Sequence, residues 1–194
     1  MNSLKLTLTG TSPMLMHSER GANPLDAKVR EHKKLTAIRK KTEDIHEKMI
    51  RSEWEIGLYH DAEIGPFLPT TNLRSCIVEG AKLSKLGASV KRATMILEDR
   101  AVLKYKGPRE IEKLWEEGRF VDVRSVVVGT SRVMRARPIF AGWSVDFTLY
   151  YDPAVLQEDQ LLSAVDSAGK FIGLGDFRPA CGGSFGRFEA KVAK

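Results

Sequence analysis

The sequence predicts an α+β fold, and the order of its apolar patterns along 194 residues is the main reason. Segments with apolar residues at every second position predict strands, and segments with apolar residues at helical spacing predict helices. In the core they follow the order strand, helix, strand, strand, helix, strand. This order favours one antiparallel sheet covered by helices on one face, within a single domain over residues 1–194.

The first predicted strand is followed by a charged insertion. Leu4, Leu6 and Leu8 alternate with polar residues, as in a strand with one buried face. Residues 24–56 then contain no glycine, carry charges of both signs and have only a thin apolar stripe. This predicts one long or two shorter helices projecting from the core. Solvation is the simplest role for them, with contact to nucleic acid or to a neighbouring subunit as alternatives.

The first core helix is expected after an extended segment, 57–69, that is rich in glycine and proline. Thr70 or Thr71 can cap its free amides, and Gly87 can end it. Four residues at helical spacing define its expected buried side: Leu73, Ile77, Ala81 and Ser84.

The middle of the chain alternates short strands with turns. The expected elements are strands around 95–97 and 101–105, a short helix over 108–117, a β-hairpin over 121–138 and a strand over 143–151. Gly129 and Thr130 would form the turn of the hairpin.

The last two elements are a helix and a closing strand. Leu161, Val165 and Ala168 recur at helical spacing, and Phe188 begins an alternating segment near the end of the chain. The complete order is the split βαβ order of a ferredoxin-like (βαββαβ) fold, with a helical insertion after the first strand and a β-hairpin insertion.

Composition narrows the class of function. Lysine and arginine outnumber aspartate and glutamate 31 to 25, which gives a net charge of +6 and favours a polyanionic partner. Cys76 and Cys181 form no zinc-type cluster, and no two histidines have HExxH spacing, so no metal or other cofactor is expected. No signal peptide and no membrane-spanning segment are expected either, which predicts a cytoplasmic protein.

Arginines gather in the predicted hairpin. Arg124, Arg132, Arg135 and Arg137 lie in a stretch without an acidic residue between Asp122 and Asp146. Guanidinium groups make bidentate, charged hydrogen bonds to phosphates, so the cluster favours nucleic-acid binding. The alternative is an exposed edge hairpin whose arginines prevent aggregation.

Nearby aromatic residues offer a place for a base to stack. Phe120, Phe140 and Trp143 flank the arginines, and non-specific single-strand binders combine such groups. Packing in the core is the alternative, and it is favoured for Trp143 because that residue starts an alternating apolar segment.

A glycine-rich stretch, GLGDFRPACGGSFG, covers residues 173–186 between the last helix and the last strand. Glycine allows backbone amides to approach a phosphate closely. The stretch lacks the Lys-Ser/Thr of a P-loop, and its helix precedes it, unlike a Rossmann fingerprint. Its candidate phosphate-binding residues are Gly173, Gly175, Arg178, Gly182, Gly183 and Ser184.

Two motifs together resemble a known family. The glycine-rich stretch, with FLPTTNLRSCIVEGA at the start of the first core helix, is similar to the RAMP superfamily of CRISPR proteins, in particular the backbone subunits that polymerise along guide RNA. Pro69 to Arg74 match the family's entry to that helix, with Thr-Thr-Asn where Gly-Ser-Ser is commoner. The hairpin would correspond to the family's thumb.

The resemblance implies a non-catalytic protein that binds single-stranded RNA or DNA and forms a homo-oligomer or filament along the strand. Other CRISPR effector subunits are possible partners, and a stand-alone relative encoded by a phage or plasmid fits equally well. The expected phosphate contacts come from Arg74, Arg124, Arg132, Arg135, Arg137 and Arg178, with the backbone amides of the loop.

Two other functions remain open. One is a protein-interaction module that mimics or engages a CRISPR effector complex. The other is an endoribonuclease, in which the resemblance to RNA-cleaving members of the family implies His17 as a general base or Asp26 as a metal ligand. A solvated histidine and a helix-stabilising carboxylate are the simpler roles for these two residues.

Overall fold

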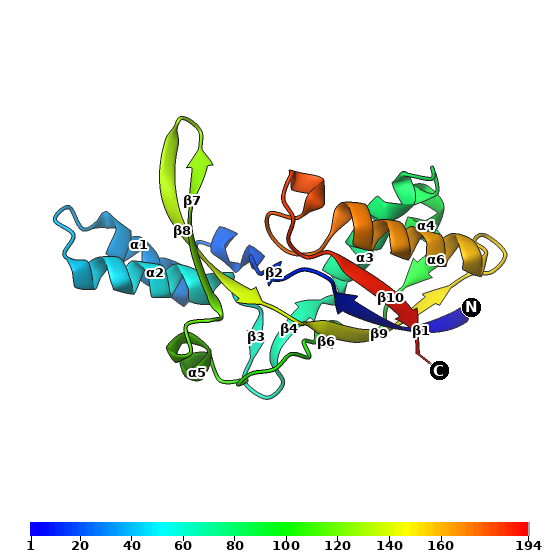
Figure 1. Ribbon diagram of the computed structural model, residues 1–194, viewed down its shortest axis with the longest axis horizontal. Coiled ribbons are helices and arrows are strands. Elements are labelled where there is room, and N and C mark those ends of the chain that lie inside the picture. Colours follow the sequence, from blue (N-terminus) through cyan, green and yellow to red (C-terminus); the bar gives the residue numbers. More distant parts are fainter. Residues whose placement is uncertain (194) are drawn as a thin grey trace.

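The computed structural model describes residues 1–193, apart from the side chain of Val128 (Figure 1). Within these residues the protein is α+β, with six α-helices and three small antiparallel sheets. The largest sheet has four strands in the order β10-β1-β9-β5. Its strands are β1 (Asn2–Gly10), β5 (Thr94–Met95), β9 (Ser144–Tyr151) and β10 (Phe188–Val192).

The first strand lies inside this sheet, between β9 and β10. Leu6 pairs with Phe147 on one side and with Val192 on the other. Leu4, Leu6 and Leu8 are buried, as their alternation predicts. The opposite face is polar, and there the Thr7 hydroxyl donates to the Asp146 carboxylate at 2.9 Å.

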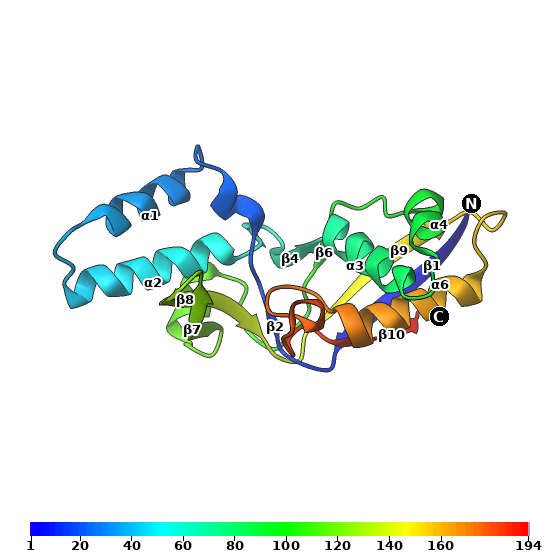
Figure 2. The ribbon, with the colours of Figure 1, turned by 90° about the horizontal axis from the view of Figure 1, so that it is seen from above.

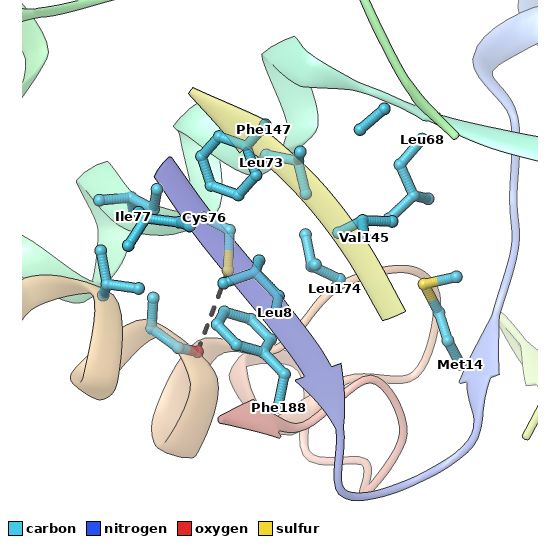
Figure 3. Packing of buried hydrophobic residues seen from close by; sticks show 14 of the residues in the cluster. Leu8, Met14, Leu68, Leu73, Cys76, Ile77, Val145, Phe147, Leu174 and Phe188 are labelled. Carbon is cyan, nitrogen blue, oxygen red and sulfur yellow. Dashed lines mark hydrogen bonds between the residues drawn. The ribbon is translucent and has the colours of Figure 1, made fainter. Parts of the chain in front are cut away.

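Three helices cover the buried face: α3 (Thr70–Lys82), α4 (Gly87–Ala93) and α6 (Glu158–Ser167) (Figures 1 and 2). A π-helix, Ala168–Ile172, extends α6. Helices α3 and α6 approach closely at Gly80, where an added Cβ would lie 2.5 Å from the Ala164 carbonyl oxygen. Figure 3 shows side chains from α3, β1 and β9 meeting in the core.

Helix α3 begins at Thr70, as predicted, but its N-cap and its end differ from the sequence prediction. Pro69, with φ −58° and ψ 130°, occupies the N-cap position and makes no side-chain cap. The Thr70 hydroxyl instead donates to the Glu98 carbonyl, and the Thr70 amide donates to the Asp99 carbonyl at 3.1 Å. Thr70 therefore ties α3 to the segment before β6. The helix ends at Lys82, so Gly87 begins α4 and Ser84 is exposed.

The other two sheets lie beside the four-stranded sheet. One has the order β2-β8-β7 and the other β3-β4-β6. Their strands are β2 (Met14–Leu15), β3 (His60–Asp61), β4 (Gly65–Pro69), β6 (Arg100–Val102), β7 (Val121–Val128) and β8 (Ser131–Phe140). Helix α5 (Ile111–Glu116) precedes β7. The predicted hairpin is confirmed, although β8 continues past residue 138 to Phe140. The tip of the hairpin projects away from the body of the molecule (Figure 1).

The charged insertion forms two helices, α1 (Ala27–Ala37) and α2 (Glu43–Gly57). Of the two predicted arrangements, one long helix or two shorter ones, the second is therefore the correct one. In α1 only Val29 is buried, which matches the thin apolar stripe. Helix α2 packs against β8, and its buried Trp54 donates from Nε1 to the Phe120 carbonyl at 2.9 Å. This contact joins the insertion to the base of the hairpin.

Candidate nucleic-acid interface

The two sequence motifs that lie about a hundred residues apart come together around one cavity of about 520 Å³, called here the loop cavity. The glycine-rich stretch contributes Gly173, Gly175, Asp176 and Arg178. Helix α3 contributes Asn72, Ser75, Cys76 and Glu79, and the segment after β2 contributes Met16 to Glu19, Gly21 and Ala22. Tyr59 and Leu68 also line the cavity, which is therefore built from segments far apart in the chain.

Glycine is needed at position 175 because the loop touches the backbone of β2. Gly175 has φ 81°, and a Cβ there would lie 2.1 Å from the Leu15 carbonyl oxygen. The neighbouring Asp176 amide donates to that same oxygen at 2.8 Å, and the Gly186 amide donates to the Pro13 carbonyl at 2.8 Å. These bonds fix the loop against the turn between β1 and β2.

Three of the glycines expected to bind phosphate use their amides inside the protein. Gly173 donates to the Ala168 carbonyl at 2.8 Å, Gly182 to the Pro179 carbonyl at 2.9 Å, and Gly183 to the Arg178 carbonyl at 3.0 Å. Their main role is thus to shape the loop. Phosphate contact by these glycines stays a prediction, and the geometry favours the loop's side chains, such as Arg178 and the exposed Ser184, as the contacting groups.

The arginines of the hairpin divide between its two faces. Opposite residues in an antiparallel pair project to the same face. Arg124 pairs with Arg135, and Asp122 pairs with Arg137, so these side chains share one face, called here the inner face. Arg132 pairs with Val127 on the other face, and its guanidinium contacts the Ser125 hydroxyl at 3.3 Å.

The inner face carries less net charge than the sequence suggested. The Glu53 carboxylate of α2 lies 3.0 Å from the Arg135 guanidinium and 3.2 Å from that of Arg137. Asp122 makes a bidentate contact with Arg124, and Asp176 of the glycine-rich loop lies 3.0 Å from Arg137. The acid-free run between Asp122 and Asp146 therefore did not predict the charge of this face, because Asp122 pairs within the hairpin and the other two partners come from distant segments.

A second cavity, of about 280 Å³, lies between the insertion and the hairpin and is called here the hairpin cavity. Its lining includes His17, His32, Glu53, Arg135 and Arg137. His17 lines both cavities, and its Nδ1 is 3.6 Å from the Asp176 carboxylate. Burial and the Arg137 charge lower the pKa of His17 below 6.5, although Asp176 acts in the opposite direction.

His32 of α1 was not singled out in the sequence. Burial lowers its pKa below 6.5. Its Nδ1 is buried and has no hydrogen-bond partner among residues 1–193. A histidine within a highly charged insertion gives no sequence signal that it faces a cavity.

The aromatic residues near the arginines are core residues. Phe120, Phe140 and Trp143 are all buried, which supports the alternative that assigned them to packing. Trp143 also donates from Nε1 to the Ser12 carbonyl at 2.9 Å. None of the three presents a ring to a base.

A different aromatic pair lies at the surface beside the inner face of the hairpin. The rings of Phe177 and Phe185, both in the glycine-rich loop, have centroids 6.3 Å apart. The Arg124 guanidinium lies 4.6 Å from the centroid of the Phe185 ring, a cation–π contact. Sequence reasoning missed this pair, although the tripeptides Asp-Phe-Arg and Ser-Phe-Gly within a glycine-rich loop were a usable signal.

Three further candidates have clear positions. Arg178 lines the loop cavity and donates to the Gly175 carbonyl at 3.0 Å. Arg74 points toward the end of α4, where its guanidinium donates to the carbonyls of Lys91 and, at 3.1 Å, Thr94. Asp26 is the N-cap of α1, and its carboxylate accepts from the amides of Lys28 and Val29. This is the helix-stabilising role that was the simpler alternative to a metal ligand.

Comparison with protein-family models and with curated proteins gave no match. Across residues 1–193, none of the helices combines the length and the apolar character needed to span a lipid bilayer.

Proposed function

We propose that this protein binds single-stranded nucleic acid, RNA or DNA, without cleaving it, and that copies assemble side by side along the strand. The observation that carries the proposal is the loop cavity, where the glycine-rich loop and the first turns of α3 meet. The inner face of the hairpin stands beside this loop, as the contacts of Arg124 with Phe185 and of Arg137 with Asp176 indicate. A strand running between them would meet arginines and exposed rings together.

We also propose that the four-stranded sheet with α3 and α6 is a ferredoxin-like core and that the protein is a relative of the RAMP superfamily. The strand order β10-β1-β9-β5 supports this, because it is the order in which the four strands of a βαββαβ chain lie. On this proposal the protein acts in the cytoplasm, either with CRISPR effector subunits or in a stand-alone phage or plasmid system.

The test is a triple variant, Arg132→Gln with Arg135→Gln and Arg137→Gln. For single strands the slope of log K against log salt is about −0.7 for each phosphate contact, so three lost contacts should reduce its magnitude by about 2. A matched control is Lys82→Gln with Lys91→Gln and Arg92→Gln, which removes the same charge from exposed positions on α3 and α4.

Loss of Arg135 and Arg137 also leaves Glu53 without its ion pairs, so circular dichroism must accompany the titration. The variant Arg132→Gln with Arg178→Gln avoids this problem, because neither residue forms an ion pair within residues 1–193. It should reduce the slope by about 1.4. If both variants bind a labelled oligonucleotide as the control does, the arginines are not its phosphate ligands. Size-exclusion chromatography with and without the oligonucleotide tests assembly.

The charge compensation of the inner face favours a second candidate, a protein-interaction module that mimics or engages a CRISPR effector. Glu53, Asp122 and Asp176 already neutralise three arginines. A surface neutralised in this way does not need a polyanionic ligand to balance its charge. The absorbance ratio at 260 and 280 nm of the purified protein separates the two functions. A protein-like ratio, with no strand binding at low salt, would support the mimic.

Cleavage of RNA is the third function to test. His17 would be the base, because its lowered pKa leaves the imidazole neutral near pH 7. We expect labelled RNA to stay intact with and without divalent metal, whereas cleavage that is lost in His17→Ala would replace the binding proposal with an enzymatic one.

A further inference from the structure

Phe177 has a backbone conformation that phenylalanine rarely adopts. Its φ is 45°, in the left-handed region, which is sterically unfavourable for a non-glycine residue. Within residues 1–193, the only other non-glycine residue with positive φ is Lys85, in the turn between α3 and α4. Strain of this kind persists only where the surroundings impose it, and it concentrates at binding sites.

The surrounding loop holds Phe177 in place. Its amide donates to the Asp176 carboxylate at 2.9 Å, and its carbonyl accepts from the Phe185 amide at 3.3 Å. Gly183 packs so closely that a Cβ there would lie 1.7 Å from the Phe177 carbonyl oxygen. Several independent contacts thus fix the backbone of Phe177 and, with it, the direction in which its side chain leaves the chain.

The strain does not serve burial of the ring, because Phe177 remains 47% exposed. The ring lies beside Phe185, on whose face Arg124 of the hairpin rests. The next residue along the chain, Arg178, lines the loop cavity. An exposed ring therefore lies beside the contact of Phe185 with Arg124 and next in the chain to Arg178, in a loop on the side of the molecule toward which the hairpin projects (Figure 1).

We propose that Phe177 is the platform on which a nucleobase of the bound strand stacks, while Arg124 and Arg178 contact the phosphates on either side. This inference rests on the proposed function and adds the residue that recognises the base rather than the backbone. Stacking on an aromatic side chain tolerates every base, because each has a π-face, so it fits a binder without sequence preference.

The experiment compares the variants Phe177→Asn and Phe177→Leu with wild type on oligo(U) and oligo(dT). Asparagine tolerates the left-handed region, so Phe177→Asn removes the ring without adding strain. Loss of one stacked base should weaken binding about five- to hundredfold. The salt slope should stay unchanged, because the phosphate contacts remain. Lys85→Asn is the matched control, since it changes the other strained position away from the loop.

A strand with abasic sites identifies the partner of the ring. It keeps the phosphates and removes the bases, so wild type should bind it as weakly as Phe177→Asn binds the intact strand, and Phe177→Asn should lose nothing further. Phe177→Leu keeps an apolar side chain in case the asparagine variant folds poorly.

The possible failures are distinguishable. If wild type binds no strand at all, the proposed function fails. If wild type binds but Phe177→Asn and Phe177→Leu bind equally well, only the stacking inference is overturned. Loss of self-association with unchanged binding to short oligonucleotides would assign the ring to a protein contact and would also overturn it.

Discussion

On the proposed function, Glu53 would compete with a bound strand for the arginines of the inner face, and its replacement should strengthen binding. Its carboxylate faces Arg135 at 3.0 Å and Arg137 at 3.2 Å and also accepts from the Ala136 amide at 3.2 Å. Glu53→Gln removes the charge but keeps an oxygen that can accept from the edge of β8. The inner face would then gain one unit of positive charge.

The size of the effect follows from Coulomb's law. A phosphate on the far side of the guanidinium groups would lie roughly 6 Å from the Glu53 carboxylate, and at an effective dielectric constant of about 40–80 their repulsion is about 0.7–1.4 kcal/mol. Its removal should tighten binding about three- to tenfold at low salt. The fold should lose about 1–2 kcal/mol, because charge-assisted hydrogen bonds become neutral ones.

Fluorescence anisotropy with a labelled oligonucleotide, at about 50 and about 200 mM salt, measures the change, with the larger gain expected at low salt. Glu112→Gln is the control, because Glu112 also pairs with an arginine, Arg51, but is carried by α5. If Glu53→Gln binds no more tightly than Glu112→Gln, only the total charge matters, and the inner face is not where the strand binds.

Three further predictions concern thiols, pH and packing. Cys181 is exposed, whereas burial raises the pKa of Cys76 to about 12. A thiol reagent should therefore modify Cys181 rapidly and Cys76 only on unfolding. Bound oligonucleotide should slow the reaction of Cys181. The folded-state pKa values of His17 and His32 lie below 6.5, so the unfolded chain binds protons before the folded protein does as the pH falls. The melting temperature should therefore fall as the pH drops below about 6.5. An equally steep fall in the double variant His17→Asn, His32→Asn would contradict this. Gly80→Ala should destabilise the protein by about 1–2 kcal/mol in urea, because overpacking between α3 and α6 exceeds the gain in helix propensity.

Elements that depend on local patterns could be predicted from the sequence. The alternation of Leu4, Leu6 and Leu8, the turn at Gly129 and the thin apolar stripe of the insertion each depend on neighbours in the chain. They correctly predicted β1, the β7–β8 hairpin and the pair α1 and α2. The start of α3 at Thr70 was predicted, but its cap was mistaken because a threonine hydroxyl has two possible uses. Thr70 bonds the distant Glu98 carbonyl rather than its own helix.

The candidate site was less accessible to sequence reasoning, because its properties come from contacts between distant segments. Glu53 reaches Arg135 and Arg137 only after α2 packs against β8. Likewise, the aromatic residues nearest to the arginines in sequence fill the core, whereas Phe185, with Phe177 beside it, contacts Arg124 of the hairpin from a distant segment. Residue types pointed to arginines and aromatic rings, but only folding determined which of these side chains lie together.

The central position of β1 has a consequence for how the chain folds. Leu6 pairs with Phe147 and Val192, so this strand must wait for partners that lie far along the chain. Closing such long loops is slow and costs much chain entropy. The β7–β8 hairpin and the α1–α2 pair join neighbouring segments and can form early. The hairpin and the α1–α2 pair would therefore form before the four-stranded sheet that supports them. Assembly of that sheet would limit the rate of refolding.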